Sequence, residues 1–199
     1  MIVQNSTKIV THDNTFTLTE NGAVKDRFTD TLVTLDTATQ VDGISLPKLF
    51  HYGQFTYDNG EFELTPFGLE KMKKYLIQEV DKISSKIEFG NIDFNGSVLD
   101  TSTPSQIRIN GAYSAVLIDP DKLIDFKNTD GTWSQLNATE ITAIAEAVAN
   151  HVQACFSNEK VLGDAINSKS TYSELMNIDL KTGWPSVIND PFNVDLLGV

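Results

Sequence analysis

The sequence predicts an α+β protein, in which a β-hairpin-rich N-terminal module precedes a helical domain with two inserted hairpins. Three observations predict this fold class. Residues 1–65 alternate apolar and polar side chains around Asn-Gly pairs, as half-buried strands do. Residues 66–178 instead repeat apolar side chains every three or four positions, as helices do, and two short alternating segments interrupt that pattern.

The N-terminal module is expected to contain at least two hairpins. Segment 15–19 alternates before Asn21-Gly22, and segments 54–57 and 61–64 flank Asn59-Gly60. Asn-Gly pairs favour tight hairpin turns because both residues tolerate a positive φ. Between the hairpins, residues 28–40 alternate threonines with larger apolar residues, which predicts another strand and loop.

The first helix is expected over residues 66–86, and its start marks the boundary between the two modules. Thr65 is suited to the cap position and Pro66 to the first helical position. A hairpin around Asn95-Gly96 should follow, then a helix over residues 105–118 and a hairpin around Asp130-Gly131. Four residues of that second helix are expected to face inward: Ile107, Ala112, Ala115 and Val116.

A long helix is expected to begin at Asn137, whose side chain can cap the amide of Glu140 while that glutamate reaches back. A second capping box, Thr171 to Glu174, predicts a short helix through Ile178. The long helix should bury one continuous apolar face, formed by Ile141, Ile144, Ala145, Val148, Val152, Cys155, Phe156, Leu162 and Ile166. The resulting domain boundaries are 1–65, 66–185 and an extended C-terminal arm at 186–199.

Composition narrows the functional classes. The net charge of −12 argues against binding to a nucleic-acid backbone, which requires a positive surface. No apolar stretch approaches the roughly 20 residues of a transmembrane helix, so no membrane insertion is expected. The single cysteine excludes a disulfide within the chain.

No catalytic, cofactor-binding or metal-binding residues are predicted, and the chain is not expected to be an enzyme. His12, His51 and His151 have no metal-ligand spacing, and no nucleotide-binding glycine loop or nucleophile elbow occurs. The acidic segment 119–125 lacks the calcium-loop pattern. Cys155 lies four residues after His151, but it lies on the apolar face, where a buried structural thiol is expected.

Residues of about 70–185 resemble a domain of unknown function found in tail and tail-fibre-associated proteins of tailed bacteriophages and prophages. The resemblance is carried by seven segments, of which 151–156 is the most specific. They are residues 91–100, 103–112, 130–133, 136–141, 149–156 with Glu159, 171–175 and 183–185. The resemblance implies a virion context and no assigned chemistry.

The expected function is therefore that of a multi-copy virion structural protein in a tail fibre, baseplate or adaptor, without a cofactor. Its partners would be other phage virion proteins and further copies of itself. It would occur in the phage tail, and in the bacterial host cytoplasm during assembly. Two alternatives stay open: a tail-fibre assembly chaperone, and a receptor-recognition module that binds host-surface glycan through aromatic residues such as Trp133 and Trp184.

Overall fold

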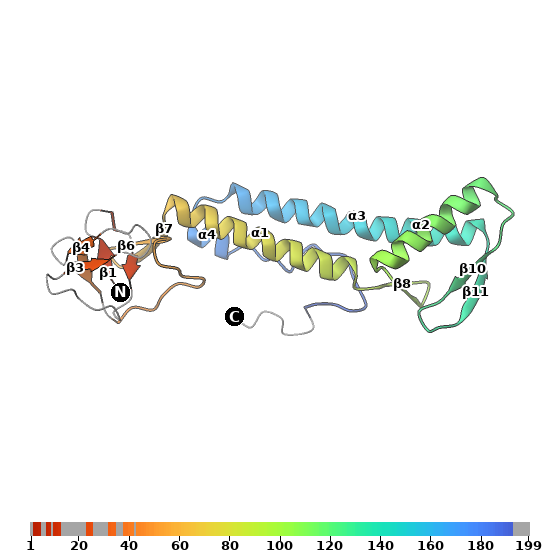
Figure 1. Ribbon diagram of the computed structural model, residues 1–199, viewed down its shortest axis with the longest axis horizontal. Coiled ribbons are helices and arrows are strands. Elements are labelled where there is room, and N and C mark those ends of the chain that lie inside the picture. The colour runs from red at the N-terminus through yellow and green to blue at the C-terminus, as the bar shows by residue number, and fades with distance from the viewer. Residues whose placement is uncertain are drawn as a thin grey trace. The chain divides into compact units, whose positions relative to one another are not determined.

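A computed structural model of the chain describes residues 2–4, 7–8, 10–12, 23–25, 32–34, 38–41 and 43–192 (Figure 1). Its contacts divide into two compact units. Unit 1 comprises Met1–Leu76 and Ile166–Ile178, and unit 2 comprises Ile77–Ala165 and Asp179–Val199. The first strand and the turn of the hairpin expected around Asn21-Gly22 lie outside the described residues. Residues 193–199 of the expected arm also lie outside them. In the described part of the chain, no helix is long and apolar enough to cross a membrane.

The described residues of unit 1 form three small antiparallel sheets. Strands β1 (Ile2–Gln4), β2 (Val10–His12) and β5 (Ala38–Gln40) form one sheet in the order β2-β1-β5. Strand β3 (Ala23–Lys25) pairs with β4 (Leu32–Thr34). Strands β6 (Phe55–Asp58) and β7 (Glu61–Leu64) form the hairpin predicted around Asn59-Gly60, and both turn residues have positive φ.

Helix α1 (Pro66–Glu88) begins where the sequence predicts. The amide of Gly68 donates to Thr65 Oγ1 at 2.9 Å, which confirms Thr65 as the cap. The predicted capping box of α4 (Tyr172–Met176) is also present in unit 1. The hydroxyl of Tyr172 donates to the carbonyl of Lys48 at 3.2 Å, and its ring packs edge-on against Phe55.

Unit 2 follows the predicted order of helix, hairpin, helix, hairpin, helix, which confirms the α+β class. After the second half of α1 come β8 (Ile92–Phe94) and β9 (Ser97–Leu99), then α2 (Thr103–Ile118). Strands β10 (Ile124–Lys127) and β11 (Trp133–Leu136) form the next hairpin, and α3 (Ala138–Ser168) follows it. Asn137 and Glu140 cap α3 reciprocally, at 2.9 and 3.0 Å, as predicted.

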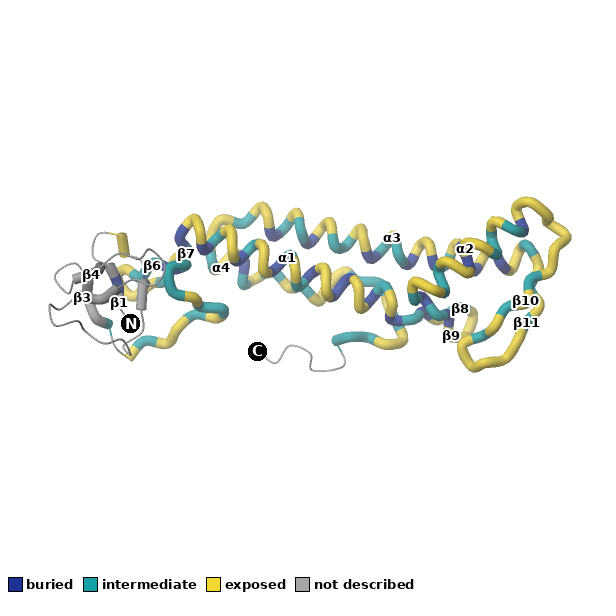
Figure 2. Tube along the Cα trace, in the orientation of Figure 1, coloured by how far each residue is buried: buried dark blue, intermediate teal, exposed yellow. Residues whose placement is uncertain are grey.

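Among the described residues, the core of unit 2 includes two hydrophobic clusters, and Figure 2 shows buried positions recurring along α3. One cluster joins the β8–β9 hairpin, α2 and α3 through Ile92, Leu99, Ile109, Ile144, Ala145 and Val148. The other joins α1, α3 and the segment after residue 178 through Ile83, Ile87 and Cys155, with Leu180, Trp184, Val187 and Phe192 packed against them.

Two residues predicted to face the core are exposed. Phe156 on α3 is 51% exposed and Ile107 on α2 is 67% exposed, so both predictions were wrong. Phe156 directly follows the buried Cys155, and a helix turns about 100° per residue, so the wider stripe assigned to α3 extended one residue too far. Helix α2 has apolar residues on all its faces, so periodicity could not indicate which of them is covered.

Candidate functional site

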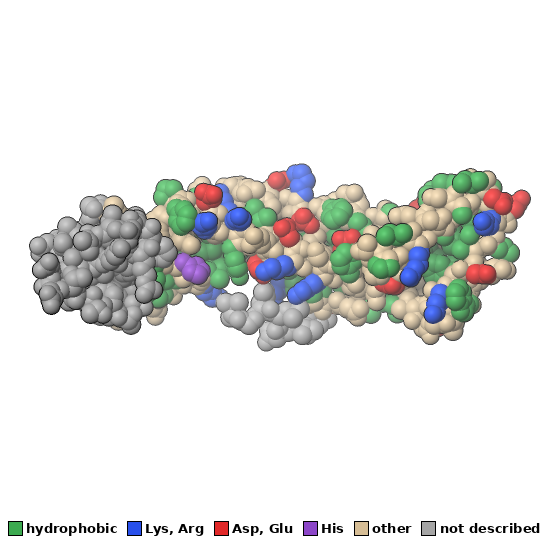
Figure 3. Space-filling model, viewed as in Figure 1, with side chains coloured by type: hydrophobic (Ala, Val, Ile, Leu, Met, Phe, Trp, Pro, Cys, Tyr) green, Lys and Arg blue, Asp and Glu red, His purple; other side chains and the backbone are tan. Residues whose placement is uncertain are grey.

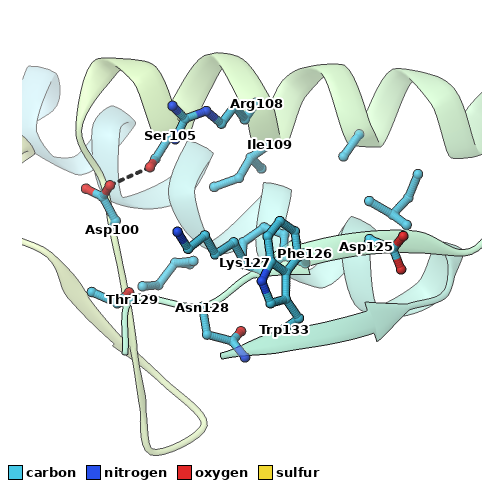
Figure 4. A pocket seen from close by; sticks show the side chains of 13 residues that line it. Asp100, Ser105, Arg108, Ile109, Asp125, Phe126, Lys127, Asn128, Thr129 and Trp133 are labelled. Atoms are coloured by element: carbon cyan, nitrogen blue, oxygen red, sulfur yellow. Dashed lines mark hydrogen bonds between the residues drawn. The ribbon is translucent and has the colours of Figure 1, made fainter. Parts of the chain in front are cut away.

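A cleft of about 620 Å³ lies between α2 and the β10–β11 hairpin in unit 2 (Figure 4). This volume is within the range of about 300–1,000 Å³ that small-molecule sites occupy. The α2 wall carries Ser105, Arg108, Ile109 and Ala112. The opposite wall is formed mainly by residues 124–129 and by Trp133.

Asp100 closes one end of the cleft and fixes the start of α2. Its carboxylate accepts hydrogen bonds from the amide of Ser102 at 2.8 Å, from the hydroxyl of Ser102 at 2.9 Å and from the hydroxyl of Ser105. Burial opposes ionisation of Asp100, but these bonds and the charge of Arg108 together lower the pKa of its carboxyl group. Asp100 is therefore an ionised structural group of the cleft.

Replacing Asp100 by alanine is expected to lower the free energy of unfolding by about 1–2 kcal/mol, because three donors at the start of α2 lose their acceptor. A carboxyl group whose pKa is lower in the folded state than in the unfolded state stabilises the protein at a pH above its unfolded-state pKa. This stabilisation is lost as the pH falls from the unfolded-state pKa through the folded-state pKa. The difference between wild type and variant should therefore shrink below pH 3.8, the ordinary value of this group. Urea unfolding at neutral and acid pH measures it, and Asp121→Ala, at an exposed position, is the control.

Two cations enter the cleft from its opposite walls. Figure 4 shows the side chains of Arg108 and Lys127 directed toward the end of the cleft that Asp100 occupies. Neither cation belongs to the ion pairs found among the described residues. The ammonium of Lys127 lies 5.9 Å from the ring centre of Trp133, which is 67% exposed. At the other end of the cleft, Asp125 accepts a hydrogen bond from Gln135 at 3.3 Å.

This arrangement is suited to binding a ligand. The cleft offers an exposed aromatic ring, two cations and the amide of Asn128, which is bonded to Thr132 and Ser134. Such a lining would suit a ligand with a flat apolar face and hydroxyl or anionic groups. No group of histidines, cysteines and carboxylates in the described residues could hold a metal ion, including the carboxylates of residues 119–125.

Large apolar side chains are exposed over α2 and the hairpin that follows it. Five of them are more than half exposed, at positions between residues 107 and 133, and Figure 3 shows apolar side chains over this end of unit 2. We call these five residues the α2 surface: Ile107, Leu117, Ile118, Leu123 and Trp133. Large apolar side chains that are exposed together in one region of a soluble protein are typical of interaction sites.

His151 and Cys155 lie in the core of unit 2, as expected for structural residues. The imidazole Nε2 of His151 lies 3.1 Å from the carbonyl of Ile87 and 3.2 Å from that of Glu88, so it donates to the end of α1. Cys155 Sγ lies 4.0 Å from the same nitrogen and is fully buried. Burial, with the charges of Glu88 and Glu159, raises the pKa of the Cys155 thiol to about 11. The pair is therefore not an activated nucleophile.

Cys155 is expected to resist alkylation by iodoacetamide in the native protein at pH 8, because a thiol with a pKa near 11 is protonated there. Labelling followed by mass spectrometry should be slow in buffer and complete in denaturant, where the thiol is accessible. Fast labelling of the native protein would contradict the burial of this residue. A raised folded pKa also means that the stabilisation from the neutral thiol is lost between about pH 9 and pH 11.

The two tryptophans predicted as glycan-binding candidates differ in their exposure. Trp133 is exposed beside the cleft, whereas Trp184 packs into the second cluster and donates its indole N–H to the carbonyl of Leu180 at 2.9 Å. Sequence reasoning missed Arg108 and Lys127. Lys127 lies opposite Trp133 in the register of the hairpin. This pairing could have been predicted from the position of the turn at Asp130-Gly131. The approach of Arg108 depends on how α2 packs, which no local pattern encodes.

Comparison with known protein families identifies a family that matches the chain. The model of a family described as "Domain of unknown function (DUF4376)" matches residues 71–181, which is more than half of the chain. No curated protein and no solved structure matches the chain.

Proposed function

We propose that this chain, which belongs to the DUF4376 family of domains of unknown function, is a structural component of a bacteriophage virion. It would be a multi-copy tail protein, associated with the tail fibre, baseplate or an adaptor. It would work through protein–protein contacts rather than catalysis, without a cofactor. It would be found in the phage tail, and in the bacterial host cytoplasm during assembly.

The observation that carries this proposal is the α2 surface. Five large apolar side chains within 27 residues stay more than half exposed, although the same unit contains a well-packed core. Exposing them to water is unfavourable, and covering them with another protein removes that cost. An assembly protein needs such a surface, whereas an enzyme would need a constellation of reactive groups. The resemblance of residues 70–185 to tail-associated proteins supplies the virion context.

Mass spectrometry of purified virions tests the proposal. The chain should be present at a fixed copy number relative to the major tail proteins, and it should stay with tails after the capsid is removed. Absence from finished particles, combined with capture on tail-fibre proteins in infected cells, would instead favour the assembly-chaperone role. Absence from both would overturn the proposal.

A second function, recognition of a host-surface glycan, is favoured by the cleft. Sugar rings stack on exposed aromatic faces, and Trp133 is 67% exposed beside polar side chains of the cleft wall. Trp184 does not share this role because its ring is packed in the core and its N–H is already bonded.

A glycan array with the purified chain tests this second function. Bound glycans should lose binding in Trp133→Ala, while the thermal stability of that variant stays close to wild type. Trp184→Ala should instead lower stability, because it removes a packed side chain. If no glycan binds, or if Trp133→Ala binds as wild type does, the cleft is not a glycan site.

A further inference from the structure

One face of α2 is apolar at both ends and small in the middle. Ile107, Gly111, Ser114 and Ile118 follow one another at helical spacings of four, three and four, so they lie along one stripe of the helix. All four are exposed, Ile107 by 67% and Ile118 by 87%. The stripe is therefore a shallow depression between two bulky side chains, on the face of α2 that unit 2 leaves uncovered.

Nothing in the part of the chain that the structure describes accounts for Gly111. A glycine inside a helix is destabilising relative to alanine. A methyl group at Gly111 would meet no atom of the described residues within 4 Å, so contacts with these residues do not require a glycine here. A second helix passing closely over this position would require it. Ser114 also suits a covered position. Its hydroxyl already donates to the carbonyl of Asn110 at 2.8 Å, so covering it would leave no unpaired donor.

The stripe is self-complementary when two copies of α2 run antiparallel. The midpoint between Ile107 and Ile118 coincides with the midpoint between Gly111 and Ser114, halfway from residue 112 to residue 113. Two copies of α2 placed antiparallel about that point would set Ile107 of each against Ile118 of the other, and Gly111 against Ser114. A two-fold interface has this property, since residue i contacts j while j contacts i.

The charges around α2 agree with the same arrangement. Two copies of a chain with a net charge of −12 repel each other, yet residues 101–118 contain no acidic residue and one basic residue, Arg108. Helical side chains lean toward their own N-terminus, so in an antiparallel pair Arg108 would extend toward the C-terminal end of the other α2. Asp119 follows that end, is exposed, and forms no ion pair among the described residues.

We propose that two copies of this chain associate through α2, antiparallel about a two-fold axis at residues 112–113, with Arg108 of each copy paired to Asp119 of the other. The axes of the two helices would approach to on the order of 8 Å because glycine and serine lie at the crossing point. This inference rests on the proposed function in one respect, that the chain works in several copies. It adds the surface, the partner and the register.

Sedimentation velocity of the full chain over a range of concentrations tests the surface. Wild type should form a dimer, and Gly111→Ala should weaken its association about tenfold because the added methyl separates the helices. The same variant should raise the melting temperature of the dilute monomer by about 2–4 °C, since alanine favours the helix. Gly163→Ala on α3, where a methyl group also meets no atom within 4 Å, is the matched control and should leave association unchanged.

A charge exchange tests the pairing. Arg108→Glu and Asp119→Lys should each weaken association about tenfold, because each replaces two symmetric attractions by repulsions. The double variant should recover most of the wild-type affinity. A double variant no stronger than the single variants would overturn the pairing of Arg108 with Asp119.

Cross-linking tests the register. Ile107→Cys mixed with Ile118→Cys should give a disulfide-linked pair of the two chains under mild oxidation. Ile107→Cys alone should not, because its two copies would lie about 16 Å apart along the helices. The buried native thiol of Cys155 does not compete.

Two results would overturn the α2 contact as a whole: a wild type that is monomeric at its highest soluble concentration, or an oligomer that Gly111→Ala leaves unchanged. Both are independent of whether the chain occurs in virions. Failure of the α2 contact is therefore distinguishable from failure of the proposed function.

Discussion

Replacing Gly68 by alanine is expected to lower the free energy of unfolding by about 3 kcal/mol or more. Gly68 lies in the first turn of α1, where a methyl group would overlap the carbonyl oxygen of Gln54 and lie 2.8 Å from its carbonyl carbon. That carbonyl cannot move freely, because it accepts the amide of Thr65 at 2.9 Å and the hydroxyl of Thr65 at 3.2 Å. The methyl group must therefore displace either the start of the helix or the segment before β6.

Urea unfolding followed by circular dichroism measures this effect, and Gly163→Ala is the matched control. Both glycines are in helices, but a methyl group at Gly163 meets no atom within 4 Å, so that variant should gain about 0.5–1 kcal/mol. Equal stabilisation by both substitutions would show that the α1 start does not pack against Gln54.

Replacing His151 by leucine is expected to lower the free energy of unfolding by about 2–4 kcal/mol. The imidazole is 6% exposed and supplies a donor to two carbonyls at the end of α1. The carbonyl of Ile87 keeps a second partner, the amide of Gly90 at 3.0 Å. The carbonyl of Glu88 has no other partner among the described residues, and leaving a part-buried acceptor unpaired costs about 1–3 kcal/mol, to which the altered packing adds.

Glutamine at position 151 separates the two parts of this cost. Its amide nitrogen can occupy roughly the place of the imidazole Nε2 and donate to the same carbonyls, so His151→Gln should lose less than half as much stability as His151→Leu. Thermal and urea unfolding of the two variants give the comparison. If leucine were tolerated as well as glutamine, the hydrogen bonds to α1 would contribute nothing measurable.

Local signals in the sequence predict most of the secondary structure. Asn59 and Asn95 adopt positive φ, as do the glycines that follow them, so these turns determine where the chain reverses whatever packs around them. The caps at Thr65, Asn137 and Thr171 act over three residues and mark the helix starts equally well. Signals of this kind are contained in a few neighbouring residues, which explains their success.

The failures concern which surface of an element is covered. The outward position of Ile107 depends on what packs against α2, and apolar residues occur on all its faces, so periodicity is uninformative there. The cleft is a similar case. Its lining spans residues 99–133 and is brought together by tertiary packing, so Arg108 could not be assigned to it from neighbouring residues.

The bond from His151 to the end of α1 also bears on the order in which the molecule folds. The start of α1 is capped by a residue three positions away, but its end receives a donor from 63 and 64 residues further along the chain. Closing so long a loop costs more chain entropy than closing the three-residue loop of the capping bond at the start of α1. The first turn of α1 can therefore form early, whereas its last turn should stay frayed until α3 has docked. Pulsed amide exchange during refolding would register this as late protection of the amides around Glu88.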